Sequence, residues 1–420
     1  MFYHDMIVSR IVVPRIQYLS QLESYRKNPE LIKVITGIRR SGKSELLRQF
    51  RQYLLDHGVS QQDVIYVDLE EKRYIIDSER MLYESIHNLI HTKGVYILLD
   101  EVQLIRGWER AVDTLRLEFE ANIYITGSNS QMTSSELGTH LTGRFVEIHI
   151  LPFSFREFIV RYPIDMENGY TQRFYQYLRW GGMPIVDLED DESKNKAILR
   201  GVYDSIVNND IRMRVDLEQG ILENVTSFMM ANIGNLVSTT NITNGALIGD
   251  PRTTEKYLSE LCKCFVFYKA SKYDIIGKKH LRTNAKFYAA DTGLRNVVIY
   301  GLEYNESALL ENVVYLELIR RGYEVFVGSY KTREIDFTAW LNGEPEFYQV
   351  VLSLTDKNTL DRETRSFVSM GPDFKRIVIT LDREFPEVPE GVKIINVIDW
   401  LLDFGGQNIL VLFNKMSAIE

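Results

Sequence analysis

A short loop between an apolar run and a helix carries the clearest chemical pattern in this chain. Residues 34–50 read VITGIRRSGKSELLRQF, and residues 37–44 fit the spacing G-x-x-x-x-G-K-[ST]. Backbone N–H groups of such a loop, and of the helix that follows it, face an anion. We therefore expect the loop to cradle the phosphates of ATP. Its expected binding residues are Gly37, Arg40, Ser41, Gly42, Lys43 and Ser44.

Two of these residues have distinct expected roles. The ammonium group of Lys43 would reach the outer phosphates, and the hydroxyl of Ser44 would hold Mg²⁺. The side chains of Arg39 and Arg40 either touch phosphate or are simply solvated, and the sequence leaves both alternatives open. ATP and Mg²⁺ are thus the cofactors that the pattern predicts.

The flanking segments supply the elements that must position this loop. Residues 31–35 (LIKVI) predict a short strand, and residues 43–58 predict a helix, because apolar residues recur there at helical spacing and Gly58 follows as a stop. Residues 64–70 (VIYVDLE) predict a second strand. The loop therefore lies between a strand and a helix, which is the context that a phosphate loop requires.

A third apolar run, at residues 95–103, contains the acidic pair Asp100 and Glu101. Buried parallel strands are almost entirely apolar and carry functional groups at their carboxyl ends. We expect Asp100 to hold Mg²⁺ through water. We expect Glu101 to orient or deprotonate the water that attacks the γ-phosphate.

Polar residues also follow the strand expected at residues 122–130 (NIYITGSNS). Ser128 or Asn129 could hydrogen-bond the attacking water or the γ-phosphate, or the segment could be a capped strand-to-helix turn. Farther on, Arg144 follows Gly143 in an expected loop. It either neutralises charge on the transferred phosphoryl group, in cis or from a neighbouring subunit, or forms a surface salt bridge.

Length and composition set the frame for this site. The chain has 420 residues, with 45% hydrophobic and 25% charged residues, and predicts roughly two to four globular domains. No apolar run reaches the roughly 18 residues of a membrane helix, and no secretory signal is visible. Its two cysteines, Cys262 and Cys264, cannot complete a metal site alone. We expect a cytoplasmic protein without a membrane partner; its net charge of -9 argues against a surface built mainly to coat nucleic acid.

Several stretches together resemble one family. GIRRSGKS, ILLDEVQLIRGWE, YITGSNSQM, LGTHLTGR and LPFSFREF, followed by YLRWGGMP, YDSIVNND, KFYAADTGLRN and REIDFTAW, are similar to AAA-type ATPases of bacteria and archaea that carry a restriction-nuclease-like C-terminal domain of unknown function. The resemblance implies an additional-strand P-loop core. It also assigns Lys43 and Ser44 to Walker A, Asp100 and Glu101 to Walker B, Ser128 or Asn129 to the sensor position, and an arginine-finger role to Arg144.

The middle of the chain predicts a helical lid and a winged helix. Residues 156–215 read as helices interrupted by GGMP, and the resemblance implies a lid there. Arg179, just before this break, either faces the phosphates or lies at the surface. Residues 216–285 read as helices followed by a β-hairpin, the order of a winged helix. The cations of this wing either contact phosphates of DNA or are merely solvated in a protein-interaction or lid-completing module. They are Lys269, Lys272, Lys278, Lys279, Arg282 and Lys286.

Residues 286–420 predict a nuclease-like domain that lacks one residue. Glu311 on a helix, Asp336 on a strand and Gln349 on the next strand resemble the PD-(D/E)XK arrangement of metal-dependent nucleases. Val351 stands where that arrangement has a lysine, and Lys331 or Lys357 are possible substitutes. Glu311 and Asp336 could instead pair with Arg320 or Arg333.

The expected fold class is α/β, with an AAA-type P-loop NTPase core (1–155), a helical lid (156–215), a winged-helix domain (216–285) and a nuclease-like domain (286–420). The expected function is a Mg²⁺-dependent ATPase that moves the later modules. A slow ATP-dependent binding switch and a DNA-processing nuclease are the alternatives. An arginine acting in trans would require a homo-oligomer.

Overall fold

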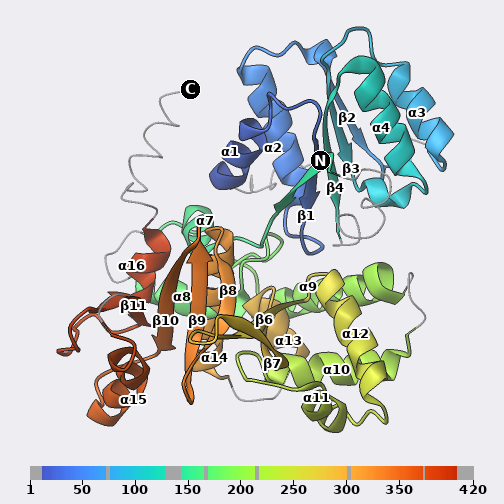
Figure 1. Ribbon diagram of the computed structural model, residues 1–420. Helices are drawn as coiled ribbons and strands as arrows, with labels where there is room; N and C mark the ends of the chain where they lie inside the picture. The colour runs from blue at the N-terminus through green and yellow to red at the C-terminus, as the bar shows by residue number, and fades with distance from the viewer. Residues whose placement is uncertain are drawn as a thin grey trace, which may run out of the picture. The chain divides into compact units, whose positions relative to one another are not determined.

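The fold is described from a computed structural model over residues 12–71, 76–128, 143–164, 169–212, 217–299, 304–371 and 374–403. Contacts divide the chain into two compact units (Figure 1). Unit 1 contains residues 1–150 and 157–165, and unit 2 contains residues 151–156 and 166–420. In the described part of the chain, no helix combines the length and apolar character needed to cross a bilayer.

Unit 1 is built on a parallel sheet with the strand order β2-β3-β4-β1-β5. Its strands are β1 (Ile32–Thr36), β2 (Val64–Asp68), β3 (Tyr96–Asp100), β4 (Asn122–Gly127) and β5 (Phe145–His149). All residues of β1 and β4 are buried, as expected for inner strands covered on both faces. The strands predicted around residues 31–35, 64–70, 95–103 and 122–130 are confirmed, and β4 lies between β1 and β3 as an additional strand.

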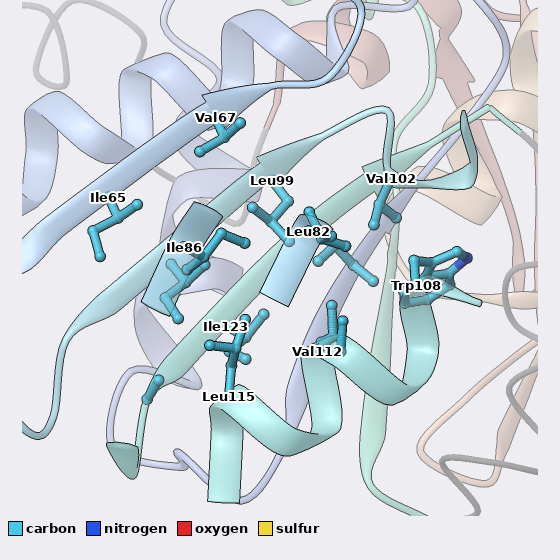
Figure 2. Close-up of a cluster of buried hydrophobic side chains, with 14 of the residues drawn as sticks. Ile65, Val67, Leu82, Ile86, Leu99, Val102, Trp108, Val112, Leu115 and Ile123 are labelled. Atoms are coloured by element: carbon cyan, nitrogen blue, oxygen red, sulfur yellow. The ribbon is translucent and has the colours of Figure 1, made fainter. Parts of the chain in front are cut away.

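Helices cover both faces of this sheet (Figure 1). They are α1 (Ile16–Ser24), α2 (Lys43–Asp56), α3 (Glu79–His87) and α4 (Trp108–Phe119), with short 3-10 turns at Gln61–Asp63 and Val102–Leu104. Because side chains alternate along a strand, Leu99 and Ile123 face α3 and α4, whereas Leu98 and Tyr124 face α1 and α2. Figure 2 shows the first of these cores, where Leu82 of α3 packs near Leu99.

Unit 2 begins with helices and ends in a mixed α/β region. Its helical segments are α8 (Gly169–Trp180), α9 (Glu192–Ser205), the π-helical η3 (Ile206–Arg212), α10 (Gln219–Ala231), α11 (Thr239–Gly245), α12 (Pro251–Lys263), α13 (Thr292–Val298), α14 (Glu306–Arg320), α15 (Lys357–Val368) and α16 (Val397–Leu402). The residues of α7 (Phe155–Arg161) are divided between the units. Asp250 caps α12, because its carboxylate accepts the N–H of Thr253.

Seven strands of unit 2 form one mixed sheet with the order β12-β11-β10-β9-β8-β6-β7. They are β6 (Phe267–Asp274), β7 (Lys279–Ala289), β8 (Glu324–Tyr330), β9 (Arg333–Leu341), β10 (Glu344–Val351), β11 (Lys375–Thr380) and β12 (Val392–Asn396). β9 and β10 are joined at Asn342 and Gly343, whose φ angles of 53° and 86° fit the tight hairpin turn that an Asn-Gly pair favours.

The hairpin β6–β7 is present as predicted, but it is not a free wing. β6 also pairs in parallel with β8, so the hairpin extends the sheet that contains β9 and β10. The expected boundary between residues 285 and 286 therefore falls inside β7. The remaining domain divisions stay predictions.

The break GGMP after α8 is fixed by a buried carboxylate. Asp291 accepts hydrogen bonds from the N–H groups of Gly182 at 2.6 Å and Leu294 at 2.9 Å. A Cβ atom on Gly181, whose φ is +72°, would lie 2.2 Å from the Asp291 carboxylate. The close approach of these two segments therefore requires glycine, and it brings the end of α8 against the start of α13.

Candidate functional site

The loop predicted to bind phosphate lies between β1 and α2. Gly37 has a φ of +149°, and a Cβ atom at this position would lie 2.3 Å from the carbonyl oxygen of Ile150. Arg40 and Gly42 also have positive φ angles, of 67° and 101°. This backbone geometry turns the chain tightly before α2 begins at Lys43, so the N-terminus of a 14-residue helix closes the loop.

The ammonium group of Lys43 lies at the centre of the loop. Its side chain is 3% exposed, and Nζ donates to the carbonyl oxygens of Gly37 at 3.2 Å and Ile38 at 3.4 Å. The carboxylate of Glu101 lies 3.8 Å from the same nitrogen. Since Glu101 follows β3 while Lys43 begins α2, the fold brings together the two groups expected to act on the terminal phosphate.

Asp100 ends β3 inside a network of hydroxyl groups. The Thr126 hydroxyl donates to the Asp100 carboxylate and accepts the backbone N–H of Glu101 at 2.8 Å. Tyr66 of β2 donates to the other oxygen of Asp100 at 3.2 Å. Thr126 lies on β4, between the strand that precedes the loop and the strand that carries the acids. It therefore fixes both acids relative to each other.

The electrostatics of Asp100 favour a cation. Burial raises the pKa of the Asp100 carboxyl, and the nearby Glu101 and Asp68 carboxylates add to the effect. Hydrogen bonds from Thr126 and Ser44 oppose it. The bond from Ser44 brings an hydroxyl oxygen and a carboxylate oxygen together. This donor pair fits Mg²⁺, which proteins bind through one or two such groups together with substrate phosphates.

Arg15 supports the loop from the N-terminal segment. Its guanidinium is 2% exposed, donates from Nε to Glu157 at 2.7 Å and from Nη1 to the Ser41 carbonyl at 3.0 Å. Gln49 of α2 accepts the backbone N–H of Arg15 at 3.1 Å. A buried, charge-paired arginine thus holds one loop carbonyl in place.

The other predicted residues of unit 1 lie in different surroundings. Ser128 is fully buried directly after β4, and Asn129 falls outside the described residues. Arg144 is 53% exposed and pairs with Asp113 at 3.3 Å. It precedes β5, at the sheet edge where β1 begins, whereas the loop follows the opposite end of β1. Because five residues of strand span about 16 Å, Arg144 lies well away from the loop of its own chain. Its role as an arginine finger stays a prediction.

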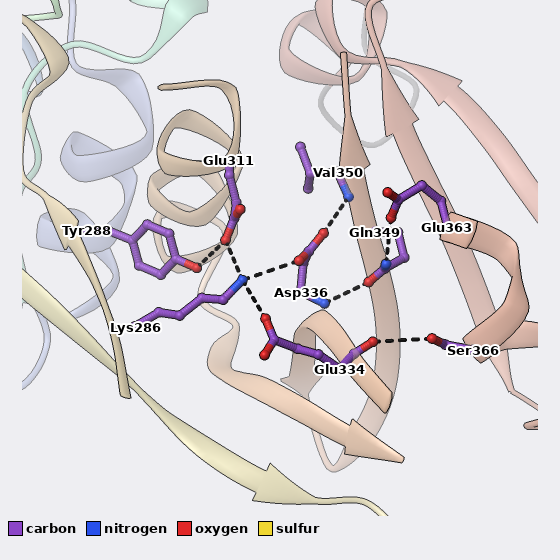
Figure 3. Close-up of polar contacts among 9 residues, drawn as sticks. All are labelled: Lys286, Tyr288, Glu311, Glu334, Asp336, Gln349, Val350, Glu363 and Ser366. Atoms are coloured by element: carbon purple, nitrogen blue, oxygen red, sulfur yellow. Dashed lines mark hydrogen bonds and ion pairs between the residues drawn. The ribbon is translucent and has the colours of Figure 1, made fainter. Parts of the chain in front are cut away.

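Unit 2 brings together a second group of charged residues, drawn in Figure 3. Lys286 of β7 donates to Glu311 of α14 at 2.9 Å and to Asp336 of β9 at 3.3 Å, and pairs with Glu334 at 2.9 Å. The Tyr288 hydroxyl donates to Glu311 at 2.7 Å. These five residues are called the Lys286 cluster below.

Gln349 of β10 holds the cluster from the other side. Its side-chain oxygen accepts the N–H of Asp336 at 2.7 Å, and its amide donates to Glu363 at 3.0 Å. The N–H of Val350 donates to the Asp336 carboxylate at 3.0 Å. The predicted juxtaposition of Glu311, Asp336 and Gln349 is therefore present in the fold.

Excess negative charge marks the Lys286 cluster. Burial first, and the Asp336 carboxylate second, raise the pKa of Glu311 to about 7, against the influence of Lys286. Burial disfavours the charged form of Lys286, but Glu311, Asp336 and Glu334 outweigh it and raise its pKa above the ordinary value. One ammonium group thus faces three carboxylates. Among the described residues, no group of three or more His, Cys, Asp or Glu has the arrangement of a complete metal site.

The assignment of Lys286 to an exposed basic wing is wrong, since it is 4% exposed and faces the acids. Val351 belongs to a hydrophobic cluster with Ile335 and Phe347. The lysine that contacts Glu311 and Asp336 is Lys286 of β7. It is neither Lys331 nor Lys357, both of which are exposed. DNA contact by Lys269, Lys272, Lys278 and Lys279 stays a prediction, and the side chain of Arg282 falls outside the described residues.

Comparison with known protein families gives one match in the first part of the chain and another in the middle. A family described as an AAA domain matches residues 29–159, and a domain of unknown function, DUF8612, matches residues 171–305. An uncharacterized protein of Haemophilus influenzae is 38% identical over 406 residues, covering 94% of this chain and 100% of that protein.

Two more distant similarities accompany these matches. An uncharacterized protein of Methanocaldococcus jannaschii is 28% identical over 375 residues, covering 83% of this chain and 80% of that protein. Among solved structures, AMPPCP-bound DnaA from Aquifex aeolicus covers 59% of this chain and 87% of its own, at 15% identity and a TM-score of 0.31.

Proposed function

Since the chain belongs to the same family as the Haemophilus influenzae protein and carries an AAA-type P-loop domain, we propose that it is a Mg²⁺-dependent ATPase. The observation that carries this proposal is the distance of 3.8 Å between the Glu101 carboxylate, which follows β3, and Nζ of Lys43, which follows the loop. A carboxylate at this distance from the lysine lies where a water attacking the γ-phosphate would be activated.

Each residue of the proposed site has a defined task. Ser44 would hold Mg²⁺ directly and Asp100 would hold it through water, and the ion would neutralise charge on the phosphates. The loop N–H groups and Lys43 would bind the phosphate oxygens, which requires Nζ to exchange its bonds to the Gly37 and Ile38 carbonyls for phosphate. Glu101 would accept the proton of the attacking water. Thr126 would keep Asp100 and Glu101 in register.

Substitution of Glu101 tests this proposal and separates it from the slow-switch alternative. We expect Glu101→Gln to bind ATP with Mg²⁺ while phosphate release falls about 10²- to 10⁴-fold, the usual contribution of a general base. Glu84→Gln is the matched control, because Glu84 lies on α3 and its side chain is 51% exposed. Equal, slow phosphate release from wild type and Glu101→Gln would favour a binding switch over an ATPase.

The Lys286 cluster supports a second proposed function, metal-dependent cleavage of nucleic acid. Lys286 supplies the ammonium group that position 351 lacks, and the excess of carboxylates over ammonium leaves charge for a divalent cation to neutralise. Glu311 and Asp336 would be the metal ligands. In the same proposal, ATP turnover in unit 1 is coupled to movement of the region that carries this cluster.

Cleavage assays with single-stranded DNA, duplex DNA and RNA in Mg²⁺ or Mn²⁺ test this second function. We expect Asp336→Asn and Lys286→Met to abolish cleavage, whereas Asp361→Asn, an exposed substitution on α15, should retain it. Absence of cleavage by the folded wild-type chain, or cleavage that persists in Asp336→Asn, would remove the nuclease proposal. Either outcome would leave the ATPase proposal untouched.

A further inference from the structure

Unit 2 contains a pocket that lies apart from the Lys286 cluster. Its volume is about 580 Å³. The end of α8, one side of α9 and the end of α13 form its walls. The lining side chains that carry the argument are Arg179, Trp180, Lys196, Arg200, Arg295 and Tyr304. Pockets that bury small organic molecules have volumes of about 300–1,000 Å³, so this one is large enough for such a ligand.

Four of these lining residues are cationic, which makes the pocket suited to an anion. Arg179 pairs with Glu192 at 2.7 Å, and Arg200 pairs with Asp204 at 3.1 Å. The two arginines and their two acidic partners are each about half exposed. Exposed ion pairs of this kind contribute little free energy and rearrange readily. Both guanidinium groups can therefore turn toward a phosphate ester without a large loss of stability.

Arg295 provides a second, independent indication. Its side chain is 3% exposed, and its guanidinium donates to the Met230 carbonyl at 3.1 Å and to the Asn296 side chain at 3.1 Å. In the described part of the chain it forms no ion pair with a carboxylate. Burial lowers the pKa of Arg295 to about 10. A buried guanidinium without a counter-ion is costly, and an anion in the pocket would supply the missing charge.

Aromatic rings complete the lining. Tyr304 is 42% exposed although it lines the pocket, and Trp180 is buried with the Arg179 guanidinium 5.1 Å from its ring centroid. Asn296 already donates its amide to the carbonyls of Leu178 and Arg179, at 3.1 and 2.8 Å. It therefore has no amide proton left to read the edge of a base. A planar ring could stack here with little discrimination among bases.

We propose that this pocket binds a mononucleotide, with its phosphate on Arg200, Arg295 and Lys196 and its base against Tyr304. A volume of about 580 Å³ matches one small organic ligand, and a single nucleotide is of that size. This site is separate from the P-loop and goes beyond the proposed ATPase. It would give unit 2 its own nucleotide ligand.

Calorimetric titration of the full chain with AMP tests the proposal, in a Lys43→Ala background so that binding at the P-loop is weakened. We expect AMP to bind, and Arg200→Ala or Tyr304→Ala to weaken its affinity about tenfold or more, as loss of a charge-assisted hydrogen bond or a stacking contact predicts. Both side chains are exposed, so the variants should fold. Lys194→Ala is the matched control, because it lies on α9, is exposed and does not line the pocket.

Three outcomes would overturn the proposal. AMP could fail to bind, its affinity could be unchanged in Arg200→Ala and Tyr304→Ala, or inorganic phosphate could bind as tightly as AMP, which would show that the base makes no contact. Binding of a short single-stranded oligonucleotide without binding of AMP would identify a nucleic-acid surface instead. Loss of ATP turnover in Glu101→Gln would be independent of each result.

Discussion

At the scale of single residues, Thr126 is the residue outside the sequence-predicted site from which we expect the largest effect on ATP hydrolysis. Its hydroxyl group connects the Asp100 carboxylate to the backbone of Glu101. Sequence reasoning assigned polar contacts at this strand end to Ser128 or Asn129, two and three residues farther on. A threonine inside an apolar strand reads as an ordinary β residue, so only the neighbouring positions of β3 and β4 identify its role.

We expect Thr126→Val to lower the rate of ATP hydrolysis while the chain stays folded. Valine has nearly the same shape but cannot bond Asp100 or accept the Glu101 N–H, and loss of hydrogen bonds to a charged group costs about 1.5–3 kcal/mol. This corresponds to a fall in kcat of about tenfold to a hundredfold. Thr114→Val is the control, because Thr114 is exposed on α4. Equal kcat values for both variants would show that Thr126 has no part in positioning the acids.

At the scale of elements, the local sequence predicted most strands and helices but not how distant strands meet. The apolar runs that became β1, β3 and β4 are buried on both faces, and such runs are recognisable without further information. The Asn-Gly pair at positions 342 and 343 is likewise a residue pattern typical of a tight hairpin turn.

Pairing between distant strands could not be read from the sequence. Nothing in the residues of β6 indicates that it pairs with β8, more than 50 positions away in the chain. For that reason Lys286 looked like one more cation of an exposed hairpin, although it faces Glu311 and Asp336. Local periodicity gives the faces of a strand but does not say which other strand covers them.

The contact between α8 and α13 should depend on pH through Asp291. Burial raises the pKa of Asp291 to about 6, despite hydrogen bonds from the N–H groups of Leu294 and Gly182. An acid whose pKa is higher in the folded state than in the unfolded state favours folding most when it is protonated. The free energy of unfolding of unit 2 should therefore fall, by up to about 3 kcal/mol, as pH rises from about 4 to about 6.

Urea unfolding of wild type and Asp291→Asn across this pH range measures the effect. The asparagine variant cannot ionise at this position. The unfolding free energy of the wild type, minus that of the variant, should therefore fall as the pH rises. Comparison of the two slopes cancels the contribution of other titrating groups, including Glu311. Parallel curves would mean that Asp291 titrates at its ordinary pKa.

At the scale of the whole molecule, the position of Arg144 bears on assembly. Arg144 lies at the end of β1 opposite the P-loop, which favours contact with the γ-phosphate of a neighbouring copy of the chain over contact with its own. We propose such a contact in a homo-oligomer. An arginine finger supplied in trans contributes about 10³- to 10⁵-fold to the rate of hydrolysis in other NTPases.

Mixing two inactive variants tests this arrangement. We expect Arg144→Ala and Lys43→Ala each to lose most ATP turnover, and their mixture to regain part of it, because some interfaces then combine an intact loop with an intact arginine. Arg110→Ala, an exposed substitution on α4, should keep full activity. Full activity of Arg144→Ala, or no recovery on mixing, would exclude a finger in trans.

Binding and turnover of ATP by the full chain test the central claim most directly. Calorimetric titration with ATP and Mg²⁺, followed by phosphate release on the same samples, should show binding and hydrolysis by wild type. Lys43→Ala should lose turnover and the binding that belongs to this loop, since Lys43 is the buried cation at its centre. Absence of binding by the folded wild-type chain, or equal binding and turnover in Lys43→Ala, would contradict a nucleotide site at this loop.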